Sequence, residues 1–140
     1  MNEDGLILVV EDNDNDAFLL REAFHRAGIL NPLRIVVTAE QATEYLLGNG
    51  LYASRRDFPL PSIIFTDLHL PRTSGLSLVR WIKSQPSLAE IPVVVMSGSD
   101  GRETREAAYE AGANLVLSKP AGQEELVQEV RLACEHLLVA

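Results

Sequence analysis

The chain has 140 residues, of which 46% are hydrophobic, and it carries a formal net charge of -8 at pH 7. This length fits one domain with a sizeable core, and the acidic balance argues against nucleic acid as a direct partner, since phosphate binding needs clustered Lys and Arg. No apolar run approaches the roughly 20 residues that span a bilayer, and the acidic N-terminus is unlike a signal peptide. We therefore expect a cytoplasmic protein that does not enter a membrane. The single Cys134 cannot form an internal disulfide and is expected in the core or an interface.

Residues 6–10 form a continuous apolar run of strand length that leads into an acidic cluster. Apolar residues at spacings of three and four then predict an amphipathic helix, with Asn13 or Asp14 as the cap and Gly28 as the terminator; these residues are Ala17, Leu20, Phe24 and Ala27.

The helix dipole favours acidic residues in a first turn, which accounts for Asp14 and Asp16 without any function. Glu11 and Asp12 precede the cap, so capping does not explain them.

A second strand is predicted at residues 33–37, followed by a capping box at residues 38–41 that opens a helix ending at Gly48. From Gly48 to Pro61 the chain has no periodicity and several Gly and Pro residues. We interpret it as a loop that is long for a compact domain, and hence as a family feature.

The run Ile63-Ile64-Phe65 has no alternation, as expected of a strand covered by helices on both faces. It delivers Asp67 to its C-terminal end, and Asp is a poor strand residue. Asp67 could simply start a turn, or it could belong to a site at the carboxyl edge of a sheet. A polar loop then leads into a third helix, whose predicted buried face is Leu78, Val79 and Ile82, with Trp81 partly buried.

A fourth strand at residues 91–96 ends in Ser97, and a fifth at residues 115–118 ends in Lys119. Between them we expect a helix opened by Asp100-Gly101, and the last helix is expected at about residues 123–138. Five strands alternating with five helices predict an α/β fold, a doubly wound five-stranded parallel sheet in a single domain, residues 1–140.

The carboxyl ends of parallel strands form the ligand-binding edge of such a sheet. The residues that the pattern brings there are Glu11, Asp12, Asp67, Ser97 and Lys119. Three carboxylates in one crevice repel one another unless a cation lies among them, and Mg²⁺ favours oxygen ligands. A carboxylate can also attack phosphorus, and an ammonium and a hydroxyl would stabilise the transferred group. This chemistry predicts Asp67 as a nucleophile, with Asp12 and Asp67 as Mg²⁺ ligands.

Four motifs in this order resemble those of response-regulator receiver domains of two-component signalling, over nearly the whole chain. They are Val10-Glu11-Asp12, Asp67-Leu68-His69-Leu70-Pro71, Ser97-Gly98-Ser99 and Ser118-Lys119-Pro120. The resemblance implies a (βα)5 flavodoxin-like receiver fold, and a phosphoacceptor signalling domain that assists its own phosphorylation and dephosphorylation and is otherwise not an enzyme.

The resemblance also assigns roles to residues. Asp67 accepts a phosphoryl group from a histidine kinase, and Mg²⁺ is bound by Asp12, Asp67 and the backbone carbonyl of His69, with Glu11 helping through water. Ser97 contacts the phosphoryl group, Lys119 pairs with it, and the Lys119-Pro120 bond is cis.

The long segment at 48–61 and the lack of an output domain narrow the resemblance to stand-alone receivers partnered with bacterial phytochromes.

Three positions depart from the family pattern. Ser74 replaces an acidic residue and is expected to weaken local capping, and Val116 replaces a frequent aromatic, which argues against an aromatic switch. His69 and Ser99 occupy variable positions that tune the phosphoryl lifetime.

Three other functions fit parts of this pattern. A haloacid dehalogenase-type phosphotransferase would have a second Asp where this chain has His69, and it usually needs room for a cap domain. A flavodoxin-like FMN carrier needs a phosphate-cradling loop after the first strand, where this chain is acidic. A receiver-like module that works without phosphorylation is the remaining alternative, although every reacting position is filled.

The expected partners are the histidine kinase, a downstream protein and a second copy of the chain. The last helix has one apolar line predicted to face the sheet and a second formed by Val127, Cys134 and Leu138. The second line is either a wide core face or an exposed patch. As a patch it would make a homodimer through the fourth helix, fifth strand and fifth helix.

Overall fold

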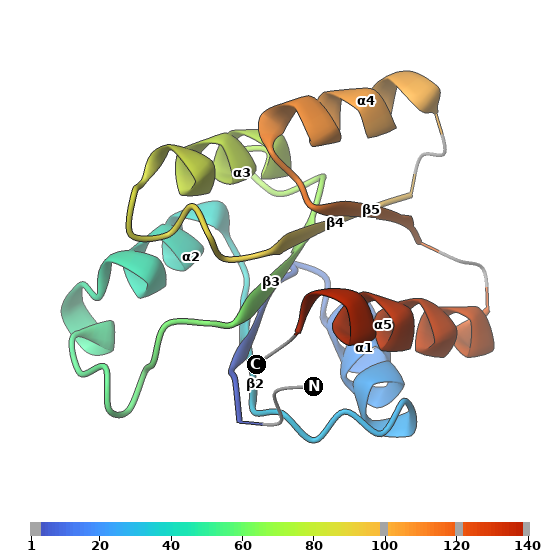
Figure 1. The fold of residues 1–140 in the computed structure, drawn as a ribbon, viewed down its shortest axis with the longest axis horizontal. Helices are drawn as coiled ribbons and strands as arrows, with labels where there is room; N and C mark the ends of the chain where they lie inside the picture. Colours follow the sequence, from blue (N-terminus) through green and yellow to red (C-terminus); the bar gives the residue numbers. More distant parts are fainter. Residues whose placement is uncertain (1–3, 99–100, 120–121, 139–140) are drawn as a thin grey trace.

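The structure is a computed structural model that describes residues 4–98, 101–119 and 122–138. Its five strands are β1 (Ile7–Val10), β2 (Leu33–Val36), β3 (Ile63–Asp67), β4 (Val93–Ser97) and β5 (Leu115–Ser118). All paired strands are parallel, and their order in the sheet is β2-β1-β3-β4-β5 (Figure 1). The predicted α/β fold with a five-stranded parallel sheet is confirmed.

Helices cover both faces of the sheet (Figure 1). They are α1 (Asp14–Arg26), α2 (Ala39–Leu47), α3 (Gly75–Ser84), α4 (Arg102–Ala111) and α5 (Gln123–Leu137). One core cluster joins α2, α3 and α4 to the sheet, and the other joins α1 and α5 to its opposite face. All residues of β1, β3 and β4 are therefore buried, whereas the edge strands β2 and β5 are partly exposed.

The predicted helix boundaries follow from local caps. The Asn13 side chain accepts a hydrogen bond from the Asp16 N–H at the start of α1, and Thr38 does the same for Gln41 in α2. Ser74 also caps α3, by accepting from the Ser77 N–H, so a side-chain cap is present at this position. The expected weakening relative to an acidic residue stays a prediction. Asp100, the expected cap of α4, lies outside the described residues.

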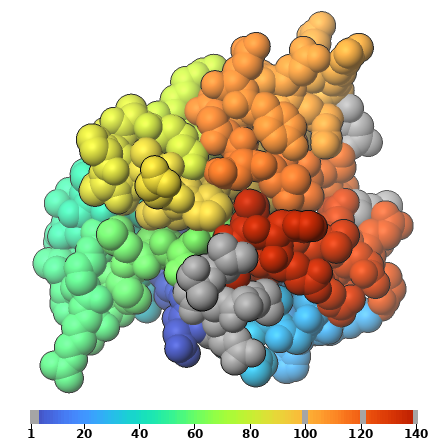
Figure 2. All heavy atoms as spheres, in the orientation of Figure 1, coloured from blue at the N-terminus to red at the C-terminus, as the bar shows by residue number. Residues whose placement is uncertain are grey.

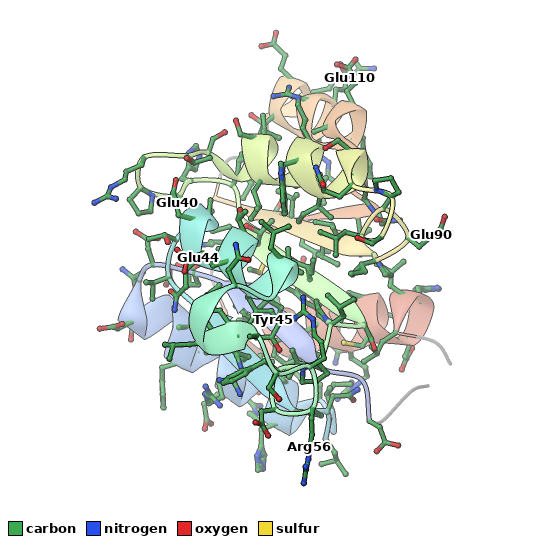
Figure 3. The ribbon with its side chains drawn as sticks, turned by 90° about the vertical axis from the view of Figure 1, so that its left-hand side faces the viewer. Glu40, Glu44, Tyr45, Arg56, Glu90 and Glu110 are labelled. Carbon is green, nitrogen blue, oxygen red and sulfur yellow. The ribbon has the colours of Figure 1, made fainter. Side chains whose placement is uncertain are left out.

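The segment after α2 is a packed element, and it contains a short 3-10 helix, η1 (Gly50–Tyr52), that the sequence did not predict. The Arg55 guanidinium donates to the carbonyls of Tyr45 and Leu46 in the last turn of α2. The Tyr45 ring contacts the rings of Tyr52 and Phe58. In the rotated view, Tyr45 lies on α2 beside this segment, and Arg56, within the segment, points away from the fold (Figure 3).

The second apolar line of α5 belongs to the core. Val127 is 4% exposed, and Cys134 and Leu138 are fully buried. Burial also raises the pKa of the Cys134 thiol to about 12. The wide-core interpretation was therefore correct and the exposed-patch interpretation wrong, because α5 packs against α1 as well as against the sheet.

Within the described part of the chain, every helix is too short or too polar to cross a membrane.

Candidate functional site

The parallel register brings the predicted site residues to one edge of the sheet. Val10 pairs with Thr66, so Glu11 and Asp12 leave β1 beside Asp67 at the end of β3. Ser97 pairs with Ser118, and the Lys119 N–H donates to the Ser97 carbonyl at 2.7 Å. The strand ends therefore converge as the sequence predicted.

Both oxygens of the Asp67 carboxylate accept hydrogen bonds. Oδ1 accepts from the backbone N–H of His69 at 3.1 Å, and Oδ2 accepts from Nζ of Lys119 at 2.9 Å. Asp67 is only 6% exposed, so these two bonds fix the orientation of a nearly buried carboxylate. The bond from His69 is the Asx-turn contact expected of a turn residue, whereas the bond from Lys119 joins the ends of β3 and β5 and is not explained by a turn.

The backbone after Asp67 is held against the start of α3. The Gly75 N–H donates to the Leu68 carbonyl at 2.9 Å, and the Leu68 N–H donates to the Met96 carbonyl in β4. A Cβ on Gly75 would lie 2.3 Å from the carbonyl oxygen of Asp67. Only glycine allows this approach, so Gly75 helps to set the position of Asp67, a role that the sequence did not reveal.

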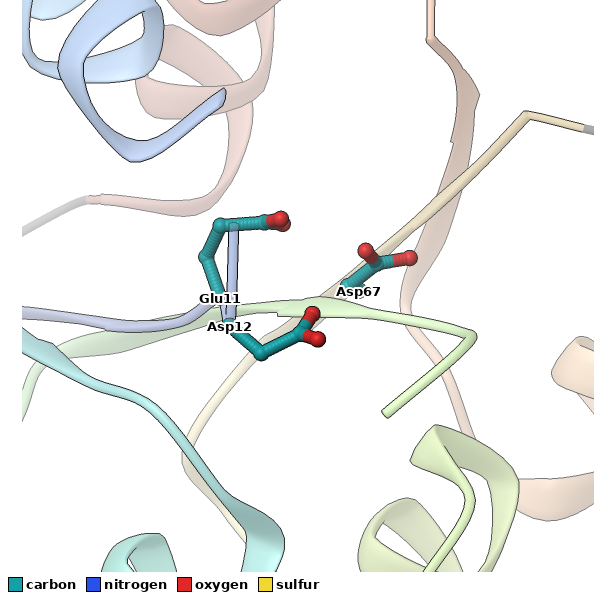
Figure 4. Close-up of side chains that lie close together, drawn as sticks. All are labelled: Glu11, Asp12 and Asp67. Atoms are coloured by element: carbon teal, nitrogen blue, oxygen red, sulfur yellow. The ribbon is translucent and has the colours of Figure 1, made fainter. Parts of the chain in front are cut away.

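Glu11, Asp12 and Asp67 each offer a carboxylate oxygen, and these oxygens all lie within 4.8 Å of one another (Figure 4). Glu11 and Asp67 are buried while Asp12 is exposed, so the cluster opens to solvent on one side. A group of hard oxygen donors with a solvent-facing side suits Mg²⁺, which keeps several of its waters. The residues present therefore fit a divalent metal ion.

Lys119 supplies positive charge to this cluster. Its Nζ lies 2.9 Å from Asp67 Oδ2, 3.2 Å from Asp16 Oδ2 and 3.4 Å from Glu11 Oε2. Burial opposes the charge of the ammonium, but the hydrogen bond and charge of Asp67, followed by Glu11 and Asp16, raise the pKa of Lys119 above its usual value. Lys119 is therefore a permanent cation that neutralises part of the carboxylate repulsion.

Glu11 is the carboxyl most affected by its surroundings. Burial first, and then the charge of Asp67, raise its pKa to about 7, although Lys119 acts in the opposite direction. Glu11 Oε1 also accepts a hydrogen bond from the Asn13 N–H at 3.3 Å. A proton or a metal ion at this position would relieve the repulsion between Glu11 and Asp67.

Asp16 is the site residue that sequence reasoning missed. It was explained by the helix dipole alone, yet its carboxylate contacts Lys119 across the site. The sequence signal that could have identified it is its position in the first turn of α1, which begins just after β1 ends at the site.

Ser97 is 1% exposed at the tip of β4, where it pairs with Ser118 of β5. Val116 is buried, and both of its backbone polar groups are bound from α4: its N–H donates to the Tyr109 hydroxyl and its carbonyl accepts from Arg105. Ser99 and the Lys119–Pro120 bond involve residues outside the described ranges.

Comparison with known proteins identifies the family. The family model "Response regulator receiver domain" matches residues 7–131 of this chain. The chain is 32% identical over 130 residues to the response regulator Rcp1 of Synechocystis sp., covering 93% of this chain and 86% of that protein. The chain therefore belongs to the response regulator receiver family, whose members act in signalling.

Solved structures narrow the relationship. The fold matches that of the response regulator RPA3017 "in red light signaling of R. palustris" with a TM-score of 0.89 and 34% identity, covering 94% of this chain and 92% of that one. It matches the phosphorylated cyanobacterial phytochrome response regulator RcpA with a TM-score of 0.86 and 32% identity, covering 96% and 94%. It also matches the Mn²⁺-bound form of Rcp1 with a TM-score of 0.82 and 31% identity, covering 97% and 96%. The chain is thus a receiver domain related to phytochrome response regulators.

Proposed function

We propose that this protein is a single-domain response regulator that accepts a phosphoryl group from a histidine kinase onto Asp67 and signals by a change in shape to a partner protein. The observation that carries the proposal is the position of Asp67, which is held by Lys119 at 2.9 Å and faces two further carboxylates within 4.8 Å.

In the transfer, an oxygen of the Asp67 carboxylate attacks the phosphorus of a phosphohistidine. A P–O bond forms as the P–N bond breaks, and the imidazole nitrogen leaves with the electron pair of that bond. Lys119 would neutralise charge on the phosphoryl oxygens, and the Ser97 hydroxyl would donate to one of them. The backbone N–H of His69 holds the other Asp67 oxygen in place.

Mg²⁺ is the proposed cofactor. Asp12, Asp67 and the backbone carbonyl of His69 would bind it, and Glu11 would assist through water. When bound, the ion would neutralise negative charge on both the carboxylates and the incoming phosphoryl group. The structure of Rcp1 is of an Mn²⁺-bound form, which supports a divalent cation as the cofactor.

The proposed kinase is of the phytochrome type, because RcpA is described as a phytochrome response regulator and RPA3017 as acting in red light signalling. The proposed location of this protein is the cytoplasm. A downstream protein is the expected receiver of the signal.

A homodimer through α4, β5 and α5 also stays a prediction. The apolar line of α5 that suggested it, Val127, Cys134 and Leu138, is buried. However, Tyr109 of α4 and Leu132 of α5 are 44% and 52% exposed.

The test is phosphorylation by acetyl phosphate with Mg²⁺, followed by intact-mass spectrometry. The parent protein should gain one phosphoryl group, and Asp67→Asn should gain none. Asp57→Asn, which changes an exposed Asp in the segment after α2, should behave as the parent. Phosphorylation of the Asp67→Asn protein would contradict the assignment. A parent protein that stays unmodified, with both acetyl phosphate and a phosphorylated kinase, would favour a phosphorylation-independent interaction module.

A further inference from the structure

Asp16 occupies the third position of α1 after the cap residue Asn13. In a capping box, an acidic side chain at this position accepts a hydrogen bond from the backbone N–H of the cap residue. Here the Asn13 N–H donates instead to Glu11 Oε1, and the Asp16 carboxylate points to Lys119, 3.2 Å from its ammonium. Helix capping therefore does not explain where this side chain lies.

The Lys119 ammonium has three N–H donors, and three carboxylates accept from it. Two of these carboxylates, on Glu11 and Asp67, are buried in the proposed site, whereas the Asp16 side chain is 43% exposed at its rim. Lys119 is thus held between the phosphoacceptor on β3 and a separate anchor on α1.

A cavity of about 290 Å³ lies beside Lys119, between α1 and α5. Apolar side chains make up much of its wall, among them Leu19, Leu20 and Leu126, while Asp16, Glu11 and Lys119 also line it. The Lys119 stem can therefore change its direction without displacing packed core atoms.

We propose that Asp16 is a positioning residue that holds the Lys119 ammonium in the unphosphorylated protein and competes for it with the phosphoryl group on Asp67. The inference rests on the proposed function. A phosphoryl group brings up to two negative charges and three acceptor oxygens, so it attracts the ammonium more strongly than the Asp67 carboxylate does. The contact with Asp16 is lost or weakened as Lys119 turns toward the new group. Asp16 thereby sets part of the free-energy difference between the unphosphorylated and phosphorylated states.

The test measures binding of beryllofluoride, a phosphoryl mimic, at saturating Mg²⁺. Asp16→Asn keeps the size of the side chain but removes its charge, so beryllofluoride should bind about three- to five-fold more tightly, as expected from losing a partly exposed ion pair. Asp14→Asn is the matched control. It removes the same charge from the same helical turn, and it should leave the affinity within error of the parent.

Two further variants separate positioning from a general charge effect. Asp16→Glu should restore most of the parent affinity, and Asp16→Asn should have no effect when combined with Lys119→Ala. The ¹⁵N resonance of the Lys119 ammonium provides a second measurement in the unphosphorylated protein. It should shift in Asp16→Asn and stay in place in Asp14→Asn.

The inference, but not the proposed function, would be overturned by any one of three results. These are equal affinities of the parent and Asp16→Asn, equal effects of Asp16→Asn and Asp14→Asn, or an unshifted Lys119 resonance in Asp16→Asn. A parent protein that does not bind beryllofluoride with Mg²⁺ would overturn the proposed function together with the inference.

Discussion

At the scale of single residues, the site balances three close carboxylates against one ammonium. Lys119 lies within hydrogen-bonding distance of Asp67 and Glu11, while Asp12 sits on the solvent side of the cluster. The protein thus contains a cation of its own near the position proposed for the metal, and each charge in the cluster should have a measurable effect.

Glu11 predicts a pH dependence of stability. Its pKa is raised by burial, and then by Asp67, from 4.5 to about 7 in the folded protein. The folded state therefore holds this proton more tightly than the unfolded state, so the stabilising effect is complete below about pH 4.5 and is lost as the pH rises toward 7. In chelator, the free energy of unfolding of the parent should fall over this interval, relative to Glu11→Gln, by up to roughly 3 kcal/mol.

Urea unfolding of both proteins at several pH values measures this difference. Parallel pH profiles for the parent and Glu11→Gln would show that Glu11 keeps an ordinary pKa.

Lys119 predicts the behaviour of the metal. Its ammonium occupies oxygens of Asp67 and Glu11 that the ion would use, and its charge repels a cation. Lys119→Ala should therefore bind Mg²⁺ more tightly, by roughly five- to ten-fold, equivalent to about 1 kcal/mol. Isothermal titration calorimetry gives the affinities, and weaker Mg²⁺ binding by Lys119→Ala would be incompatible with competition.

At the scale of elements, the contact between α3 and the end of β3 predicts a large effect of one methyl group. In Gly75→Ala the new Cβ would meet the Asp67 carbonyl at 2.3 Å and the Leu68 Cα at 2.9 Å. The backbone must move, which should cost about 1–3 kcal/mol of stability and slow the phosphorylation of Asp67. Gly98→Ala, at the tip of β4, is a suitable comparison because no atom lies within 4 Å of its new Cβ. Thermal melts that do not distinguish the two variants would contradict this prediction.

The strands and helices could be predicted from the sequence because each strand is a short, largely apolar run, and the helix after it has apolar residues at spacings of three and four. The same logic located the site, since residues that follow parallel strands must meet at one edge, as Asp67 and Lys119 do. What the sequence could not give is the direction of a side chain. Asp16 satisfies a helix-dipole explanation and contacts Lys119 as well. The segment after α2 has no periodicity, because it folds by packing its aromatic rings and by the bonds of Arg55 to the end of α2.

At the scale of the whole molecule, metal binding should stabilise the fold. The cluster of Glu11, Asp12 and Asp67 exists only when β1 and β3 are paired, so an ion that binds there favours the folded state by mass action. At a Mg²⁺ concentration about 100 times the dissociation constant, the gain would be about 2.7 kcal/mol. The melting temperature of the parent should rise with Mg²⁺.

Asp12→Ala tests both the ion and the repulsion. In chelator it should melt higher than the parent, because one of three mutually repelling charges is gone, and Mg²⁺ should then raise its melting temperature much less. A lower melting temperature in chelator would mean that Asp12 makes stabilising bonds that exceed the repulsion.

The proposed homodimer depends on which side chains of α5 remain available once the domain has folded. Figure 2 shows α4 (orange) and α5 (red) adjoining on one face of the molecule. On α5, Val127 is 4% exposed and lies in the core, while Leu132 is 52% exposed. Substitution of each by Glu should therefore separate folding from association. Val127→Glu places a charge in the core and should destabilise or unfold the protein.

Leu132→Glu should leave the fold intact and, if α5 forms the interface, shift the protein from dimer to monomer in sedimentation equilibrium. Leu51→Glu, at an 84% exposed position in η1, should leave the oligomeric state of the parent unchanged. A Leu132→Glu protein with the same mass in solution as the parent would place any interface elsewhere on the molecule.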